Sequence, residues 1–126
     1  MHYERLTHSI IGCAFEVHRT LGFGYLESVY HKALLMELAG AGLHVEAEIP
    51  LTVYYKGREA GYFVVDILVE DEIVIELKSV EHLSKAHEVQ LVNYLTGMGK
   101  DVGLLINFGP EKAQIKRKYK NNSGQD

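Results

Sequence analysis

The sequence has a single cysteine among its 126 residues, so no disulfide can form within the chain. Cys13 lies among apolar residues at helical spacing, which is typical of a buried structural thiol rather than a reactive one. The N-terminal residues lack the apolar segment of a signal peptide, and no apolar run approaches the roughly 20 residues that span a membrane. We therefore expect a cytoplasmic protein without membrane segments.

The chain also lacks an excess of positive charge. It contains 13 Lys and Arg residues and 17 Asp and Glu residues, which gives a formal net charge of -4. Proteins that bind nucleic-acid phosphates usually present a basic surface instead. Two bound divalent cations would cancel this charge. Five basic residues lie close together near the C-terminus: Lys112, Lys116, Arg117, Lys118 and Lys120. This cluster fits either a phosphate-binding surface or a solvated tail.

Several familiar chemistries have no sequence signal here. The seven histidines show no zinc-ligand spacing, no glycine-rich phosphate loop joins a strand to a helix, and no serine lies in a nucleophile elbow. The length is that of one domain with one core. We expect a single domain over residues 1–120, followed by a polar tail over residues 121–126.

The most informative stretch is 66–78, in which two β-branched apolar runs flank the acidic residues 70–72. This pattern is typical of a tight hairpin between two buried strands. A three-residue loop pairs Val69 with Ile73, and counting back along both strands sets two acidic side chains opposite each other.

These two side chains are Asp66 and Glu76. Like charges directly opposed on neighbouring strands are destabilising, and a hard cation such as Mg²⁺ or Mn²⁺ offsets the repulsion because it takes carboxylate oxygens as ligands. Lys78 shares a strand face with Glu76, where it could neutralise a phosphate oxygen or help to deprotonate a water. The alternative is a surface Glu76–Lys78 ion pair worth roughly 0–1 kcal/mol, which the apolar flanking runs disfavour.

Hydrophobic spacing predicts the remaining elements. We expect helices over residues 3–21, 26–39 and 84–98, and strands over residues 44–55, 61–69, 73–79 and 102–108. Strand 102–108 is apolar on both faces and follows a helix, so it should pair parallel with strand 73–79. The basic segment up to Tyr119 is expected to add an edge strand. This order indicates a small two-layer α/β domain.

Three parts of the sequence resemble one nuclease superfamily. Asp66 followed by Glu76-Leu77-Lys78 is similar to the metal-binding signature of the PD-(D/E)xK nucleases, with Val65 in place of the signature's proline. The segment Gly24-x-x-Glu27-x-x-Tyr30 resembles the one after which a branch of that superfamily, the GxxExxY proteins, is named. The helix motif His87-x-x-Gln90-x-x-x-Tyr94 is also similar to this branch.

The resemblance implies a fold and a site. The fold is a restriction-endonuclease-like αβββαβ core of the α/β (α+β) class, a mixed sheet flanked by helices with one extra N-terminal helix. Asp66, Glu76 and the Leu77 carbonyl would hold Mg²⁺ or Mn²⁺, and Glu27 would support a second ion or a ligating water. Lys78 would position or activate the attacking water.

Three further residues are expected to line the substrate: Gln90, Tyr94 and Tyr30. The alternative for Gln90 and Tyr94 is an ordinary amphipathic helix whose tyrosine belongs to the core. His31 is interpreted as a partly exposed helix residue, and Glu48 as solvent-facing.

We therefore expect a metal-dependent nuclease that hydrolyses phosphodiester bonds of nucleic acid, with DNA the expected substrate and a homodimer the expected assembly. The alternative is a catalytically inactive nuclease-fold module that binds nucleic acid or protein.

Overall fold

The computed structural model of the chain describes residues 2–120, so the predicted tail 121–126 lies outside the described residues. Within them the helices are α1 (His2–Leu21), α2 (Glu27–Gly40) and α3 (Lys85–Met98), and the strands are β1 (Val45–Tyr55), β2 (Arg58–Val69), β3 (Ile73–Lys78), β4 (Val102–Phe108) and β5 (Ala113–Tyr119). This is the predicted order, including the edge strand formed by the basic segment. No helix in this part of the chain is long and apolar enough to cross a membrane.

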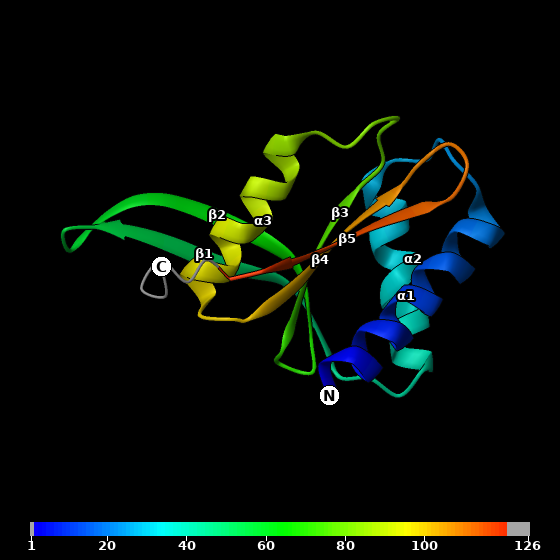
Figure 1. The fold of residues 1–126 in the computed structure, drawn as a ribbon, viewed down its shortest axis with the longest axis horizontal. Coiled ribbons are helices and arrows are strands. Elements are labelled where there is room, and N and C mark those ends of the chain that lie inside the picture. The colour runs from blue at the N-terminus through cyan, green and yellow to red at the C-terminus, as the bar shows by residue number, and fades with distance from the viewer. Residues whose placement is uncertain (1, 121–126) are drawn as a thin grey trace.

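The five strands of the described chain form one mixed sheet in the order β1-β2-β3-β4-β5. β3 pairs parallel with β4, as predicted, and the other neighbours are antiparallel. β1 and β2 are longer than the other strands and extend beyond them as a two-stranded arm (Figure 1). Pro50 lies in β1, an edge strand, which is where a proline within a sheet is usually found.

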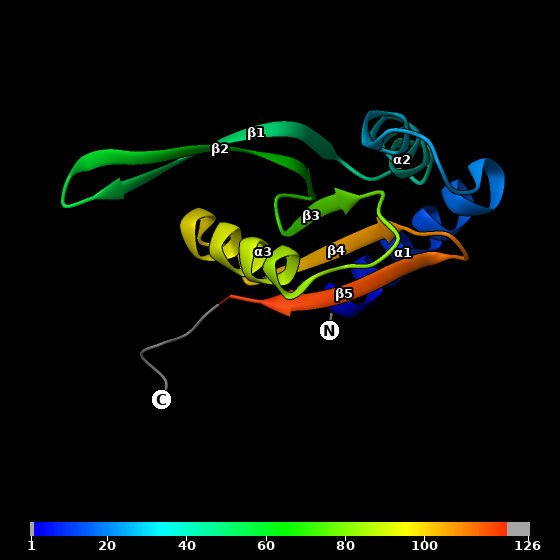
Figure 2. The same cartoon turned by 90° about the horizontal axis from the view of Figure 1, so that it is seen from above.

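Helices cover both faces of the sheet, so the expectation of two layers is wrong. α1 and α2 pack on one face around a cluster that includes Ile10, Leu34 and Ile75. α3 packs on the other face around Leu91 and Val74, and Figure 2 shows α3 in front of β4 with α1 behind it. The physical reason is that β3 and β4 are apolar on both faces, and each face must be removed from water.

One glycine sets how closely α3 approaches the sheet. A Cβ atom on Gly103 of β4 would lie 3.0 Å from Cδ1 of Leu91 and 3.1 Å from Cδ2 of Leu95. These distances are shorter than carbon atoms normally approach, so a larger residue at this position would force the two leucine side chains, and the helix that carries them, to shift.

Two tight turns set the strand register around the arm and the hairpin. Lys56 and Gly57 join β1 to β2 with φ of 50° and 81°, the left-handed pair that a two-residue hairpin turn needs. Residues 70–72 join β2 to β3 and pair Val69 with Ile73, as predicted.

Candidate active site

The candidate site lies where β2 and β3 separate. Their backbone pairing ends at Ile67 and Ile75, and side chains bridge the strands at the next position. The Asp66 backbone N–H donates to Oε1 of Glu76 at 3.0 Å, and the Leu77 N–H donates to Oδ2 of Asp66 at 2.8 Å. The predicted opposition of Asp66 and Glu76 is confirmed, and each carboxylate is held by the backbone of the other strand.

The neighbouring strand β1 brings a third carboxylate to this point. The register that pairs Ala47 with Ile67 and Ile49 with Val65 sets Glu48 beside Asp66. Glu48 has a φ of 55°, a left-handed conformation that costs energy for a residue with a Cβ atom. Glu48 is exposed to solvent, as expected, and it also lines the cavity beside Asp66.

The side-chain alternation of β2 also changes at Asp66. In a regular strand Val65 and Ile67 would share a face, yet Val65 packs with the α3 cluster and Ile67 with the α1–α2 cluster. The irregularity is local, since Leu68 and Val69 resume the alternation. It places Asp66 at the boundary between the two faces.

The helix α2 completes this side of the site. Nε2 of His31 lies 3.1 Å from the Asp66 carbonyl oxygen, and because a carbonyl only accepts, Nε2 carries the proton and donates it. The site opens into a cavity of about 230 Å³. Its lining residues come from α2 and the three strands β1, β2 and β3: Glu27, Ser28, His31, Glu48, Val64, Asp66 and Leu77. His31 is thus part of the site, which its sequence context did not indicate.

Glu27 reaches this cavity because the loop before α2 is tied to the end of β3. The Ser79 hydroxyl donates to the Tyr25 carbonyl oxygen at 3.0 Å, and Glu27 is the first residue of α2. In residues 2–120, however, no three His, Cys, Asp or Glu side chains converge as a metal-ligand group. The structure places Glu27 beside the paired carboxylates without joining it to them.

The electrostatics of the pair show a surplus of negative charge. Glu76 is 5% exposed, and burial, followed by the Asp66 charge, raises its pKa to about 8, although the Asp66 N–H and Lys78 act in the opposite direction. Burial also raises the pKa of Asp66, against the Leu77 N–H, His31 and Lys78. A buried and a partly buried carboxylate that Lys78 does not neutralise offer hard oxygen ligands, which fits a divalent cation such as Mg²⁺ or Mn²⁺.

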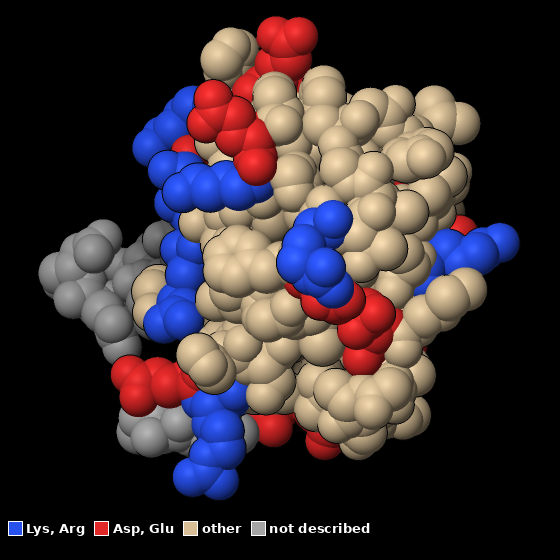
Figure 3. Space-filling view, turned by 90° about the vertical axis from the view of Figure 1, so that its right-hand side faces the viewer, with Lys and Arg blue, Asp and Glu red and all other residues tan. Residues whose placement is uncertain are grey.

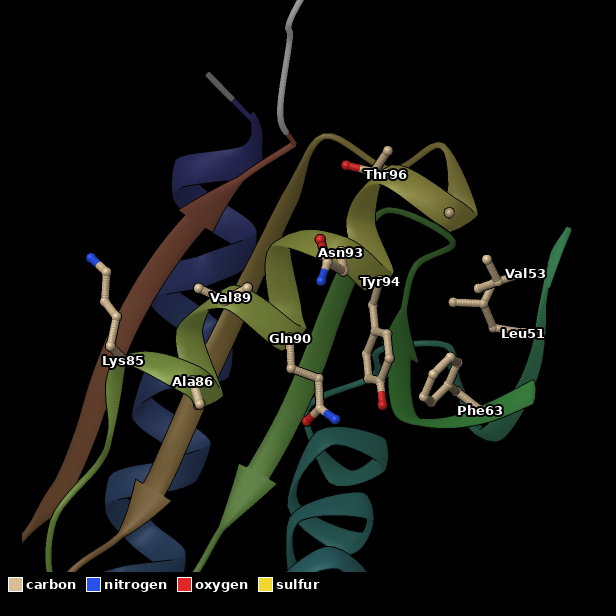
Figure 4. Close-up of a pocket in the computed structure, with 11 residues that line it drawn as sticks. Leu51, Val53, Phe63, Lys85, Ala86, Val89, Gln90, Asn93, Tyr94 and Thr96 are labelled. Atoms are coloured by element: carbon tan, nitrogen blue, oxygen red, sulfur yellow. The ribbon is translucent and has the colours of Figure 1, made fainter. Parts of the chain in front are cut away.

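Tyr94 approaches the pair from α3. The side chain is almost fully buried, and its pKa is raised by burial and by the charges of Glu76 and Asp66. Gln90 lies one helical turn earlier, and Figure 4 shows both side chains extending from the same side of α3. Their sequence-predicted proximity in the helix is confirmed, while their contact with substrate stays a prediction.

The histidine of the same helix motif has a different position. Ser84 is the N-cap of α3, as its residue type predicts; its hydroxyl accepts from the His87 N–H at 3.4 Å, and its own N–H donates to Nδ1 of His87 at 3.1 Å. His87 therefore belongs to the helix cap rather than to the carboxylate site.

The expectation that Tyr30 lines the substrate is not compatible with its position. The residue is fully buried, its ring stacks on Phe108 with centroids 4.5 Å apart, and its hydroxyl donates to the Gly22 carbonyl oxygen. The hydroxyl also accepts from the Tyr25 N–H at 3.3 Å. Tyr30 anchors the α1–α2 loop to the core, and this loop in turn positions Glu27.

The basic C-terminal cluster belongs to β5 and its ends rather than to a solvated tail. Nζ of Lys118 lies 2.9 Å from Oε1 of Glu88, and Nη2 of Arg117 donates to the Thr7 hydroxyl at 3.0 Å. Figure 3, which views the molecule from the side of α1 and α2, shows a mostly uncharged face with most of its Lys and Arg along one edge and others near the centre and at the opposite edge. Part of the basic charge is therefore used within the fold.

Comparisons with known proteins agree with this architecture. The family model of the PD-(D/E)XK nuclease superfamily matches residues 4–118. A crystal structure of a protein designated SSO0001 resembles the fold with a TM-score of 0.61 and 20% sequence identity, covering 78% of this chain. The match spans about half of that protein, 52% of its length. Comparison with curated proteins gives no match. The chain belongs to the PD-(D/E)XK nuclease superfamily.

Proposed function

We propose that this protein is a Mg²⁺- or Mn²⁺-dependent nuclease of the GxxExxY branch that hydrolyses phosphodiester bonds of nucleic acid. The observation that supports it best is the pair Asp66 and Glu76. Glu76 is buried and Asp66 partly buried, each carboxylate accepts a backbone hydrogen bond from the other strand, and nearby positive charge does not balance theirs. A divalent ion in this position would stabilise negative charge on the phosphoryl oxygens of the transition state.

The chain's own residues divide the work as follows. Asp66, Glu76 and the Leu77 carbonyl would hold the ion, and Glu27, which lines the same cavity as Asp66, would hold a ligating water or a second ion. Lys78, whose charge acts on both carboxyls, orients the attacking water and donates a hydrogen bond to a phosphoryl oxygen.

His31 has a positioning role in this proposal. Its hydrogen bond to the Asp66 carbonyl holds the irregular part of β2, and with it the carboxylate, in place. Removing this bond is expected to weaken metal binding without touching the ligands themselves.

DNA is the proposed substrate and a homodimer the proposed assembly, because so small a domain contacts little of a duplex alone. Cleavage of matched DNA and RNA tests the first proposal, and sedimentation velocity over a range of protein concentrations tests the second.

A second candidate function is a nuclease-fold module that binds nucleic acid or protein without hydrolysis. The observation that favours it is that, within residues 2–120, Asp66 and Glu76 are not joined by a third acidic or histidine ligand. Metal binding separates the two functions, since an ion that binds the folded state raises the melting temperature by mass action.

The decisive experiment is calorimetric titration of Mn²⁺ into the wild type, Asp66→Asn and Glu76→Gln, with cleavage assays on single-stranded, branched and duplex substrates. Lys78→Ala tests the hydrolysis step separately from metal binding, because it leaves the proposed metal ligands in place. We expect Mn²⁺ binding and cleavage in the wild type, neither in the first two variants, and binding without cleavage in Lys78→Ala. A wild type that binds nucleic acid but neither binds Mn²⁺ nor cleaves would favour the binding module.

A further inference from the structure

A large groove runs between α3 and the β1–β2 arm, on the side of the sheet opposite to α2. Its volume is about 770 Å³, within the roughly 300–1,000 Å³ of typical ligand pockets. The walls are mainly apolar and aromatic, with Leu51 and Phe63 from the arm facing Tyr94 from α3 (Figure 4). Val89 of α3 also lines the groove. The groove is much larger than the cavity beside Glu27 and is not used by the proposed hydrolysis.

The groove lies next to the paired carboxylates. Phe63, in its wall, lies three residues before Asp66 in β2, and Tyr94 packs in the same buried cluster as Val65, the residue directly before Asp66. A substrate whose phosphate lies at the carboxylates could therefore place a neighbouring group in the groove.

The lining indicates what kind of group this is. Phe63 is 40% exposed, and its ring centroid is 5.6 Å from that of Tyr94 at an interplanar angle of 51°, which leaves an aromatic face open to a planar ligand. Gln90 and Asn93 add amide donors and acceptors to the wall. Of the described residues that line the groove, Lys85 is the only charged one.

Apolar walls, an open aromatic ring, amide groups and a cation match a nucleobase and its phosphate. Bases stack on aromatic side chains through their flat faces and hydrogen-bond through their edges. In a duplex these faces are covered by neighbouring bases, so a base enters a pocket only from a single strand or after leaving the stack.

We propose that the groove between α3 and the β1–β2 arm binds an unpaired base of the nucleic-acid substrate, stacked on Phe63. This inference rests on the proposed function and specifies its substrate class: single-stranded or locally unpaired nucleic acid rather than continuous duplex. The base selects the strand, and the adjoining phosphate reaches Asp66 and Glu76.

The test is equilibrium binding measured by fluorescence anisotropy with labelled oligonucleotides in Ca²⁺, with gels to verify that they stay intact. Three probes share one phosphate backbone length: a single strand, the corresponding duplex, and a strand of abasic residues. The variant is Phe63→Ala. Its matched control is Tyr62→Ala, which removes a more exposed aromatic side chain from the next position of β2, on the opposite face and outside the groove.

We expect the wild type to bind the single strand more tightly than the duplex or the abasic strand. Phe63→Ala should weaken single-strand binding about 5- to 150-fold, the effect of losing one stacked base, and Tyr62→Ala should leave it unchanged. Val89→Glu, at an exposed groove position on α3, should also weaken it because the added carboxylate repels phosphate. Thermal unfolding verifies that each variant is folded.

Equal binding of the base-containing and abasic strands would overturn the proposal, as would equal effects of the Phe63 and Tyr62 variants. A groove that instead holds a second copy of the chain would show as a dimer lost in Val89→Glu, with no dependence on bases. The proposed function fails separately: Mn²⁺ titration reports on Asp66 and Glu76 whether or not bases are recognised. Base-dependent binding without hydrolysis would support the groove as a base-binding site and refute the proposed nuclease activity.

Discussion

The raised pKa of Glu76 predicts that replacing it with glutamine stabilises the metal-free protein, and that the gain depends on pH. The glutamine side chain would keep an oxygen that accepts from the Asp66 N–H but has no charge to bury. The wild-type carboxyl pKa rises from its ordinary value of 4.5 to about 8 on folding. Between these two pH values the folded protein keeps a proton that the unfolded chain has lost, so wild-type stability falls as pH rises through this window.

The magnitude follows from the size of the shift. One unit of pKa difference between the folded and unfolded states is equivalent to about 1.4 kcal/mol. Relative to the wild type, Glu76→Gln should gain almost nothing near pH 4.5, about 3 kcal/mol at pH 7 and at most about 5 kcal/mol above pH 8. The pKa of Asp66 is also raised, but Asp66 is present in both proteins, so most of its contribution cancels in the difference.

The assay is urea denaturation in EDTA at a series of pH values, with the unfolding free energy extrapolated to water. Glu59→Gln, an exposed position on β2, is the matched control and should follow the wild-type curve. A stability difference that is the same at pH 5 and pH 8 would refute the inference that Glu76 is an uncompensated buried carboxyl. A gain in stability together with a loss of Mn²⁺ binding would show that the buried Glu76 carboxyl destabilises the fold but is required for metal binding.

The described contacts lead to three more predictions. Because the Glu76 proton must leave before an ion binds, Mn²⁺ affinity should rise about tenfold per pH unit up to about pH 8. Calorimetry in two buffers of different ionisation heat should detect the released proton. Mn²⁺ binding that does not depend on pH would contradict this prediction. Tyr30→Phe should lower the free energy of unfolding by about 1 kcal/mol and leave oligonucleotide binding unchanged. Weaker oligonucleotide binding would indicate that Tyr30 contacts the substrate. Asn107→Leu should cost about 2 kcal/mol in urea denaturation, since the buried amide holds both backbone groups of Val80; the exposed control Asn93→Leu should cost much less.

Much of the fold follows from local sequence signals. The apolar run on each side of residues 70–72 and the short loop between them define the β2–β3 hairpin, and the hairpin sets Asp66 opposite Glu76 by counting alone. Ser84 as N-cap and the run 102–108, apolar on both faces, define α3 and β4 in the same way. These predictions succeed because turns, caps and alternation depend on neighbours in sequence.

The position of Tyr30 depends on tertiary packing instead. Helical spacing places Tyr30 near Glu27 on α2, but it does not say which side of the helix meets the sheet. Docking of α2 buries the tyrosine against Phe108 and leaves Glu27 at the cavity. A large aromatic ring gains more from burial than a carboxylate, which must keep access to solvent or a cation.

The position of Glu48 beside Asp66 also depends on the strand pairing, which local sequence does not reveal. Starting from the turn, Tyr55 pairs with Arg58, and a regular hairpin would set Glu48 opposite Val65. One extra residue in β2 shifts the register between Val53 and Tyr54, so that Glu48 lies beside Asp66 instead. A bulge of one residue adds a residue to one strand only, so counting from the turn does not reveal the register beyond it. Local sequence was thus enough to pair the two carboxylates, whereas the packing of the sheet and its helices selected the side chains that surround them.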